Sequence, residues 1–296
     1  MWLADQWNDY EVIDCSKGEK LERWGDYLLV RPDPQVIWDT PKKEKGWRKM
    51  NGHYHRSSKG GGEWEFFQLP KEWTIQYSLP INKKLTFHLK PFSCKHTGLF
   101  PEQAANWNWF SQLIADAVSK GRQVKVLNLF AYTGGATLAA AAAGASVTHV
   151  DASKGMVAWA KENAISSSLK DAPIRWLVDD CVKFVEREIR RGNHYDAIIM
   201  DPPSYGRGPK GEIWKIEESV YPLIQLCSQI LTDNPLFFLI NSYTTGLQPA
   251  VLSYMISTVL GTANGTVTAS EIGLPVSSNG LVLPCGASGR YEATGI

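Results

Sequence analysis

The sequence predicts an α/β fold in which a mostly parallel sheet follows a small β-rich region, and three observations support this. After residue 120, apolar stretches of strand length alternate with helical patterns, as they do when helices connect parallel strands. Before residue 100, short strand patterns are separated by turn residues. Nine of the twelve tryptophans lie before residue 120. The chain is therefore expected to contain a β-rich domain at 1–100, which is a candidate for substrate binding, a connecting helix at 101–120 and an α/β domain at 121–296.

The individual elements follow from hydrophobic periodicity and turn residues. Strand patterns at 27–30 and 73–77 belong to the first domain. In the connecting helix, Pro101 occupies a first-turn position that tolerates proline, and apolar residues follow at helical spacing. The α/β domain is expected to contain strands near 124–130, 146–151, 173–178, 194–200, 235–241, 265–272 and 280–285. The last two strands have no helical pattern between them, so they are expected to form an antiparallel hairpin that closes the sheet.

The segment from Val126 to Thr137 predicts a binding turn for a cofactor. A fully apolar strand, typical of a buried parallel strand, runs into a turn of small residues, and an alanine-rich helix follows. Gly134 and Gly135 allow the backbone to approach a ligand closely, and the amides at the start of the helix face that ligand. The turn lacks the G-x-G-x-x-G spacing that fits a pyrophosphate, which argues against a nicotinamide-dependent enzyme.

Two acidic residues end strands of this predicted sheet. Asp151 ends the second strand, where a carboxylate can accept hydrogen bonds from the hydroxyls of a ribose. Asp151 could instead cap the helix that starts near Lys154, since aspartate is favoured there. Asp201 ends the fourth strand and is followed by Pro202 and Pro203, which fix a turn. Proline has no amide hydrogen, so the carbonyls around this turn are expected to accept hydrogen bonds from a ligand in the crevice at the strand ends.

Five segments, taken in order, resemble a known family. They are 31–35, 96–103, 127–135, 178–181 and 201–203. The chain resembles the class I S-adenosylmethionine-dependent methyltransferases of the group related to the ribosomal large-subunit RNA base methyltransferases. The resemblance implies a Rossmann-like methyltransferase sheet with an antiparallel last strand, and the cofactor S-adenosyl-L-methionine lying across the carboxyl ends of the first strands.

The candidate cofactor-binding residues follow from the turn, the strand ends and the resemblance. They are Gln103, Phe130, Tyr132, Thr133, Gly134, Gly135, Asp151, Ala152, Ser153, Asp180 and Asp201. The resemblance implies that Asp180, or its neighbour Asp179, holds the exocyclic amine of the adenine; Asp180 could instead cap the helix that follows. It also implies that the segment 100–103 folds over the cofactor.

The candidate catalytic residues are Asp201, Pro202, Pro203 and Tyr205. For a nitrogen acceptor, the carboxylate and free carbonyls would orient the amine while Tyr205 stacks on an extruded base. Ser204 separates the second proline from the tyrosine, unlike the pattern of amine methyltransferases. Methylation of a pyrimidine carbon would instead require a thiolate nucleophile, for which Cys285 in an expected open turn is the candidate; it could equally be an incidental cysteine.

Three residues are candidates for substrate binding: Arg207 and Lys210 in a glycine-rich loop after the Asp-Pro-Pro turn, and Tyr243 in a polar segment after the fifth strand. The basic loop 42–59 carries seven lysines and arginines against one glutamate, or +6, and could bind RNA or remain solvated. The net charge of +1 gives no overall attraction to nucleic acid.

The predicted function is S-adenosylmethionine-dependent methylation of a base in ribosomal or other structured RNA, a step of rRNA processing. A small-molecule or protein acceptor, an NAD(P)-dependent oxidoreductase and a non-catalytic RNA-binding protein are the alternatives. The odd number of five cysteines and the lack of an apolar membrane-spanning run predict a cytoplasmic protein with reduced thiols. No metal site is expected, and the oligomeric state is left open.

Overall fold

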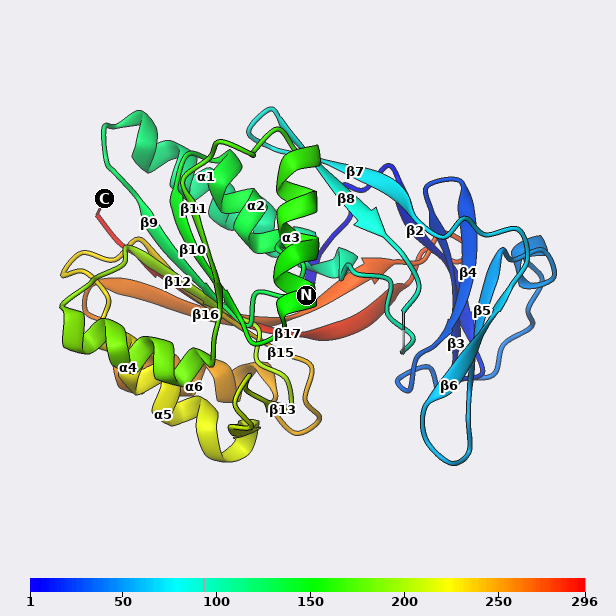
Figure 1. Ribbon diagram of the computed structural model, residues 1–296. Helices are drawn as coiled ribbons and strands as arrows, with labels where there is room; N and C mark the ends of the chain where they lie inside the picture. The colour runs from blue at the N-terminus through cyan, green and yellow to red at the C-terminus, as the bar shows by residue number, and fades with distance from the viewer. Residues whose placement is uncertain (93, 296) are drawn as a thin grey trace.

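Two sheets of different size dominate the structure (Figure 1). The computed structural model describes residues 1–92 and 94–295. The larger sheet contains β1 (Trp2–Leu3), β9 (Lys125–Leu129), β10 (Ser146–Asp151), β11 (Ile174–Val178), β12 (Ala197–Met200), β15 (Phe237–Ser242), β16 (Gly265–Pro275) and β17 (Val282–Ala293). The smaller sheet contains β2 (Tyr10–Ser16), β3 (Glu19–Trp24), β4 (Tyr27–Pro32), β5 (Gly52–Arg56) and β6 (Gly62–Phe66).

Two hairpins and a set of helices complete the fold. The hairpins are β7 (Trp73–Leu79) with β8 (Lys83–Leu89), and β13 (Tyr205–Arg207) with β14 (Ile213–Lys215). The helices are η1 (Lys45–Trp47), η2 (Pro101–Gln103), α1 (Ala104–Ser119), α2 (Gly135–Ala142), α3 (Lys154–Ser166), α4 (Cys181–Arg191), α5 (Ile216–Ser228) and α6 (Pro249–Leu260). Within the described residues, no helix is both long enough and apolar enough to cross a membrane.

The larger sheet confirms the predicted fold class. Its strand order is β1-β16-β17-β15-β12-β9-β10-β11, and β15, β12, β9, β10 and β11 pair in parallel. The predicted antiparallel hairpin is present, because β17 runs antiparallel to both β16 and β15. Two expected bounds were wrong. The last strand extends to Ala293, and the strand expected from 194 begins at Ala197. The connecting helical segment begins at Pro101, as the 3-10 turn η2 that leads into α1.

The core lies on both faces of the larger sheet. Because side chains alternate along a strand, Val126 joins the cluster on one face and Leu127 the cluster on the other. Helices α1, α2 and α3 cover the first face, and α4, α5 and α6 cover the second (Figure 1). Both faces of the sheet are therefore covered, and the loops at the carboxyl ends of the parallel strands form the site.

The smaller sheet is joined to the larger one in two places. Strand β1 pairs with β16, so the first residues of the chain lie in the larger sheet. On the other side, the turn after β16 reaches β2, where the amide of Ser277 donates to the carbonyl of Val12 at 2.9 Å. The hairpin of β7 and β8 packs against α3. The domain boundary expected at residue 100 stays a prediction, although these contacts show that the N-terminal hundred residues belong to both sheets.

Two glycines stand at the start of α2, and each is needed for a different reason. Gly134 is the N-cap of the helix and has φ +88°, a conformation that glycine adopts without strain. A Cβ atom added to Gly135 would lie 2.6 Å from Cζ2 of Trp107. Close packing between α1 and α2 therefore explains the absence of a side chain at Gly135.

We predict that Gly135→Ala lowers the free energy of unfolding by about 1–3 kcal/mol, because the new methyl group forces Trp107 or the start of α2 to move. Gly155→Ala is the control. This glycine lies in α3, and a Cβ there would meet nothing closer than Ser153 Oγ at 3.9 Å. The control should be neutral or stabilising by up to about 1 kcal/mol. Urea unfolding of both variants checks the difference, and equal stability of the two would contradict the packing explanation.

Candidate active site

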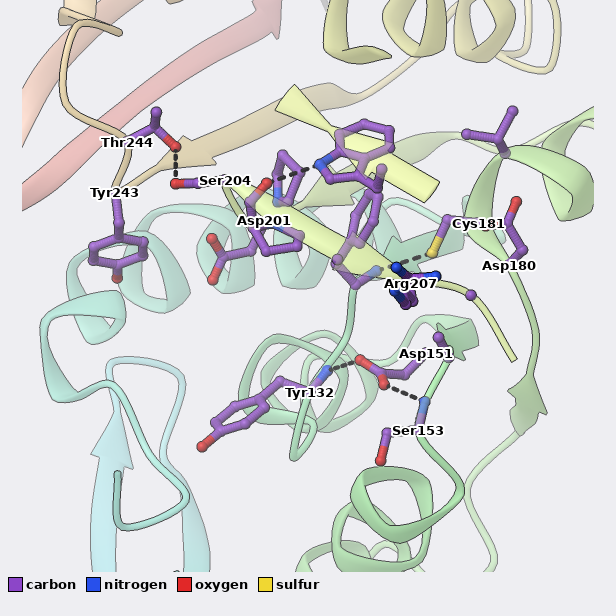
Figure 2. A pocket seen from close by; sticks show the side chains of 18 of the residues that line it. Tyr132, Asp151, Ser153, Asp180, Cys181, Asp201, Ser204, Arg207, Tyr243 and Thr244 are labelled. Atoms are coloured by element: carbon purple, nitrogen blue, oxygen red, sulfur yellow. Dashed lines mark hydrogen bonds between the residues drawn. The ribbon is translucent and has the colours of Figure 1, made fainter. Parts of the chain in front are cut away.

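A cavity of about 440 Å³ opens at the carboxyl ends of β9, β10 and β12 (Figure 2). This volume is within the range of small-molecule and cofactor sites. It is lined by His96, Phe100, Phe130, Tyr132, Asp151, Ala152, Ser153, Asp180, Cys181, Val182, Asp201, Pro202, Pro203, Ser204, Gly206, Arg207, Gly208, Trp214, Tyr243 and Thr244. The segments predicted to form the site therefore meet in one cavity.

The turn after β9 is strained in a way that the sequence did not indicate. Phe130 and Tyr132 have φ of 56° and 54°, in the left-handed region that non-glycine residues rarely adopt. Such conformations cluster at functional sites. Here they place the backbone amide of Tyr132 within 2.8 Å of Asp151 Oδ2, and they leave the buried Tyr132 hydroxyl without a partner among the described residues.

Asp151 is held rigidly at the edge of the cavity. One carboxylate oxygen accepts from the amide of Tyr132 and the other from the amide of Ser153, each at 2.8 Å (Figure 2). Burial raises the pKa of this carboxyl group, and the two backbone hydrogen bonds oppose the rise. Ser153, not Asp151, is the N-cap of α3. The alternative that Asp151 caps this helix is therefore wrong.

Asp180 caps a helix and also lines the cavity. Its Oδ2 accepts from the amide of Lys183 at 2.9 Å as the N-cap of α4, and its side chain also lines the cavity. Its neighbour Asp179 pairs with Arg187 and is not among the lining residues. Of the two acids, Asp180 is thus the one placed to contact a ligand.

Asp201 enters the cavity from the end of β12. None of the described residues donates a hydrogen bond to its carboxylate, nor to the carbonyls of Asp201 and Pro202. The carbonyl of Pro203 is occupied, since Trp214 Nε1 donates to it at 2.8 Å. Burial raises the pKa of Asp201 to about 7, and the nearby charge of Glu102 adds to the effect. The turn therefore presents a set of unused hydrogen-bond acceptors to the cavity.

The segment from His96 to Gln103 borders the same cavity. Gln103 Nε2 donates to the Tyr243 hydroxyl at 2.8 Å, and that hydroxyl donates to Glu102 at 3.0 Å. Gln103 does not line the main cavity. It lines an adjoining pocket of about 50 Å³ together with Thr133, Gly135 and other residues of the turn. Gly134 lines neither cavity.

The loop after Pro203 is a short hairpin of β13 and β14, and only some of its residues line the cavity. Arg207 lines the mouth of the cavity, whereas Lys210 does not. Tyr205, expected as a stacking platform, is 53% exposed and is not among the lining residues. The aromatic rings that do line the cavity are those of Phe100, Phe130, Tyr132, Trp214 and Tyr243, with His96 beside them.

Cys285 lies inside strand β17 and not in an open turn, so its expected position was wrong. It is half-buried, its thiol donates to the carbonyl of Leu283 at 3.4 Å, and burial raises its pKa well above the ordinary value. A protonated thiol is a poor nucleophile. Cys181 and Cys227 are fully buried, as expected for structural cysteines.

The charges of the cavity favour a cationic ligand. Asp151, Asp180 and Asp201 line it, whereas Arg207 is the one lysine or arginine among the described lining residues. Burial lowers the pKa of His96 to about 4, so this ring is neutral. A dinucleotide pyrophosphate would be repelled by three carboxylates, whereas a nucleoside that carries positive charge would be attracted. The fold and the cavity define an enzyme that binds a nucleoside cofactor at the strand ends of an α/β sheet.

Comparison with known proteins identifies the family. The model of the S-adenosylmethionine-dependent methyltransferases matches residues 63–214. A crystal structure of the SAM-dependent methyltransferase from Agrobacterium tumefaciens is 36% identical, with a TM-score of 0.89 over 97% of this chain and 91% of that one. A protein crystallised in complex with SAH shares the fold at 20% identity, with a TM-score of 0.71 over 97% and 76% of the two chains. The chain belongs to the S-adenosylmethionine-dependent methyltransferases.

Two curated relatives have a more specific name. The ribosomal RNA large subunit methyltransferases K/L of Pseudoalteromonas atlantica and Shewanella oneidensis are 28% and 32% identical to this chain. The matches cover 76% and 78% of this chain. They cover only 33% and 31% of those relatives, so the chain spans about a third of their length.

The residues of the cavity fit S-adenosylmethionine. A sulfonium and an ammonium give this cofactor positive charge, which suits three carboxylates around one cavity. We expect Asp151 to accept the ribose hydroxyls, since it is fixed at the strand end that binds ribose in such sheets. We also expect Asp180 to meet the adenine amine, and the small pocket with Gln103, Thr133 and Gly135 to receive the amino-acid end. Phe130, Ala152 and Ser153 would contact the nucleoside.

Proposed function

We propose that this enzyme methylates a base of structured RNA, with large-subunit ribosomal RNA as the first candidate. The names of the curated relatives support this choice of acceptor, although the chain matches about a third of their length. In this proposal Asp151 binds the cofactor on one side of the cavity, and Asp201 binds the methyl acceptor on the other. The observation that carries the proposal is the unused carboxylate of Asp201 beside two unused carbonyls.

These acceptors suit the edge of a nucleobase. A ring or exocyclic N–H can donate to the Asp201 carboxylate and to the carbonyls of Asp201 and Pro202, which orients the nitrogen. Bound S-adenosylmethionine supplies an electrophilic methyl group, so the protein mainly has to hold the acceptor in line. The rings of Phe100 and Tyr243, whose centroids are 5.6 Å apart, form an aromatic wall on this side of the cavity. They replace Tyr205 as the proposed stacking surface for an extruded base.

Transfer of labelled methyl groups tests the proposal. Purified enzyme and labelled S-adenosylmethionine are incubated with total RNA from a strain that lacks the gene. The RNA is then digested, and the nucleosides are separated and identified by mass spectrometry. One methylated nucleoside, present in wild-type RNA and missing from the deletion strain, is expected. Label in small molecules or protein but not in RNA would refute an RNA acceptor.

We predict that Arg207→Ala weakens acceptor binding and leaves cofactor binding nearly unchanged. Arg207 is exposed at the mouth of the cavity, where its charge can meet a phosphate of a bound strand. The KM for RNA should rise about tenfold, the equivalent of one charged contact. Lys210→Ala removes the same charge from the same hairpin outside the cavity and serves as control. Equal loss of affinity for S-adenosylmethionine would contradict this role.

A further inference from the structure

A second cavity, of about 610 Å³, lies between the smaller sheet and the larger one. It shares His96, Phe100, Tyr243 and Thr244 with the cofactor cavity, so the two spaces are continuous on the acceptor side. Its other wall includes Lys20 and Arg31 of the smaller sheet, with Lys95 from the segment that follows β8. Beyond Pro34, a third hollow of about 340 Å³ continues along the smaller sheet and includes Arg56. The three hollows therefore adjoin one another and form a path that leads away from the Asp201 turn.

Two cations of the smaller sheet that line this path, Arg31 and Lys20, both have acidic partners. Arg31 is bound to the buried Glu22, with Nε 2.6 Å from Oε1. Burial would raise the pKa of Glu22, but the charge of Arg31 overrides it and lowers the pKa to about 2. Lys20 lies 3.7 Å from Asp33. These pairs neutralise one another and leave little charge for a ligand.

Lys95 and Arg56 are different. Neither forms an ion pair with any described carboxylate, and the polar contact of Lys95 Nζ is the carbonyl of Pro32 at 3.5 Å. Lys95 is half-buried beside other cations. Burial lowers its pKa to about 8, and the charges of Lys20, Arg31 and Arg56 contribute to this change. A bound anion would offset the repulsion from these neighbouring cations and would favour the charged form of Lys95.

We propose that the path from the Asp201 turn to Arg56 binds the chain of a polynucleotide, with Lys95 and Arg56 each contacting a backbone phosphate that flanks the target base. This inference rests on the proposed function, because the RNA held along the path is the strand that carries the base to be methylated. The length of the path favours a polynucleotide over a small molecule as the acceptor. A free small molecule at Asp201 would not reach Arg56, which lies in a separate hollow beyond Pro34.

Only part of the basic loop 42–59 lies along the path. Arg56 lines a hollow on the path, whereas Lys49 is exposed and lines none of the cavities described above. Lys42 is occupied, since it pairs with Glu19 at 3.0 Å. The loop as a whole is therefore not the binding surface in this proposal, and its residues should differ in effect.

Binding of a short fluorescein-labelled single-stranded RNA, followed by anisotropy at several salt concentrations with SAH present, tests the path. Lys95→Ala and Arg56→Ala should each weaken binding about three- to tenfold and reduce the slope of log affinity against log salt by about 0.7. Lys49→Ala is the matched control and should bind like the wild type. Unchanged affinity for S-adenosylmethionine shows that each variant is folded.

The outcomes separate this inference from the proposed function. If the wild type methylates RNA while both variants bind the oligonucleotide normally, or if Lys49→Ala weakens binding as much as they do, the path is refuted and the function stands. Failure of the wild type to bind the oligonucleotide also refutes the path. Binding that depends on Lys95 and Arg56, without methyl transfer to any RNA, supports the path and refutes RNA as the methyl acceptor.

Discussion

Asp151→Ala is expected to abolish measurable binding of S-adenosylmethionine. The wild-type carboxylate is fixed by two backbone amides and offers its remaining lone pairs to the ribose hydroxyls. Loss of two hydrogen bonds to a charged acceptor costs about 1.5–3 kcal/mol each, so affinity should fall at least about a hundredfold. Calorimetric titration with S-adenosylmethionine and with SAH measures this directly.

Two further variants make the result specific to the ribose contact. Asp151 also holds the strained turn at Tyr132, so its removal could loosen the turn. Asp151→Asn keeps one acceptor oxygen for a backbone amide, so it should bind the cofactor more weakly than wild type but lose less stability than Asp151→Ala. Asp201→Asn changes the same chemical group on the acceptor side and should keep most of the cofactor affinity. Wild-type affinity in Asp151→Ala would remove this residue from the cofactor site.

Asp201→Asn is expected to lower kcat for methyl transfer about a hundredfold, the range of a positioned acid–base group. The reaction should also lose its dependence on pH. Burial raises the pKa of Asp201 to about 7, so the carboxylate that accepts a hydrogen bond from the base forms only as the pH rises. Wild-type activity should therefore increase with pH, with an apparent pKa no higher than about 7, because the positive charge of bound cofactor favours the ionised form. A flat wild-type profile between pH 5 and 8 would contradict this role.

The same substitution should stabilise the protein above pH 7. Between its ordinary pKa near 4 and its folded value of about 7, the Asp201 carboxyl group is protonated in the folded state and ionised in the unfolded state. Folding takes up a proton in this range, so the free energy of unfolding falls as the pH rises through it. Asparagine removes the buried charge, and urea unfolding at pH 8 should show Asp201→Asn to be the more stable protein. A variant that is both more stable and less active would show that the buried Asp201 carboxylate lowers the stability of the protein and is needed for its activity.

The sequence predicted the parts of the site that depend on strand order. Asp151, Asp180 and Asp201 were placed together because the carboxyl ends of parallel strands meet at one edge, and all three line one cavity. The antiparallel hairpin at the end of the chain was predictable for a similar reason, since two strand patterns lacked a helix between them. These features depend on local periodicity and on rules that connect neighbouring elements.

The parts that were missed depend on packing between distant segments. Tyr205 was expected to stack on the base from its place after the prolines, but the hairpin of β13 and β14 turns it to solvent. Tyr243, which the sequence did place at this edge, lines the cavity, and its hydroxyl is held by contacts with Gln103 and Glu102 that the sequence could not indicate. Lys95 had no sequence signal at all, because its unpaired state depends on which carboxylates Lys20 and Arg31 occupy.

The pairing of β1 with β16 constrains how the chain can fold during synthesis. Trp2 and Leu3 form the outer edge of the larger sheet by pairing with Ile272 and Gly273. The ribosome must release the residues of β16 before this edge can close, and contacts so distant in sequence form slowly. Until then the smaller sheet also lacks its contact with Ser277, and the path beside it has no fixed wall. Ribosome-bound nascent chains that stop before β16 should therefore be sensitive to proteases at their N-terminus, even when β9 to β12 have already paired.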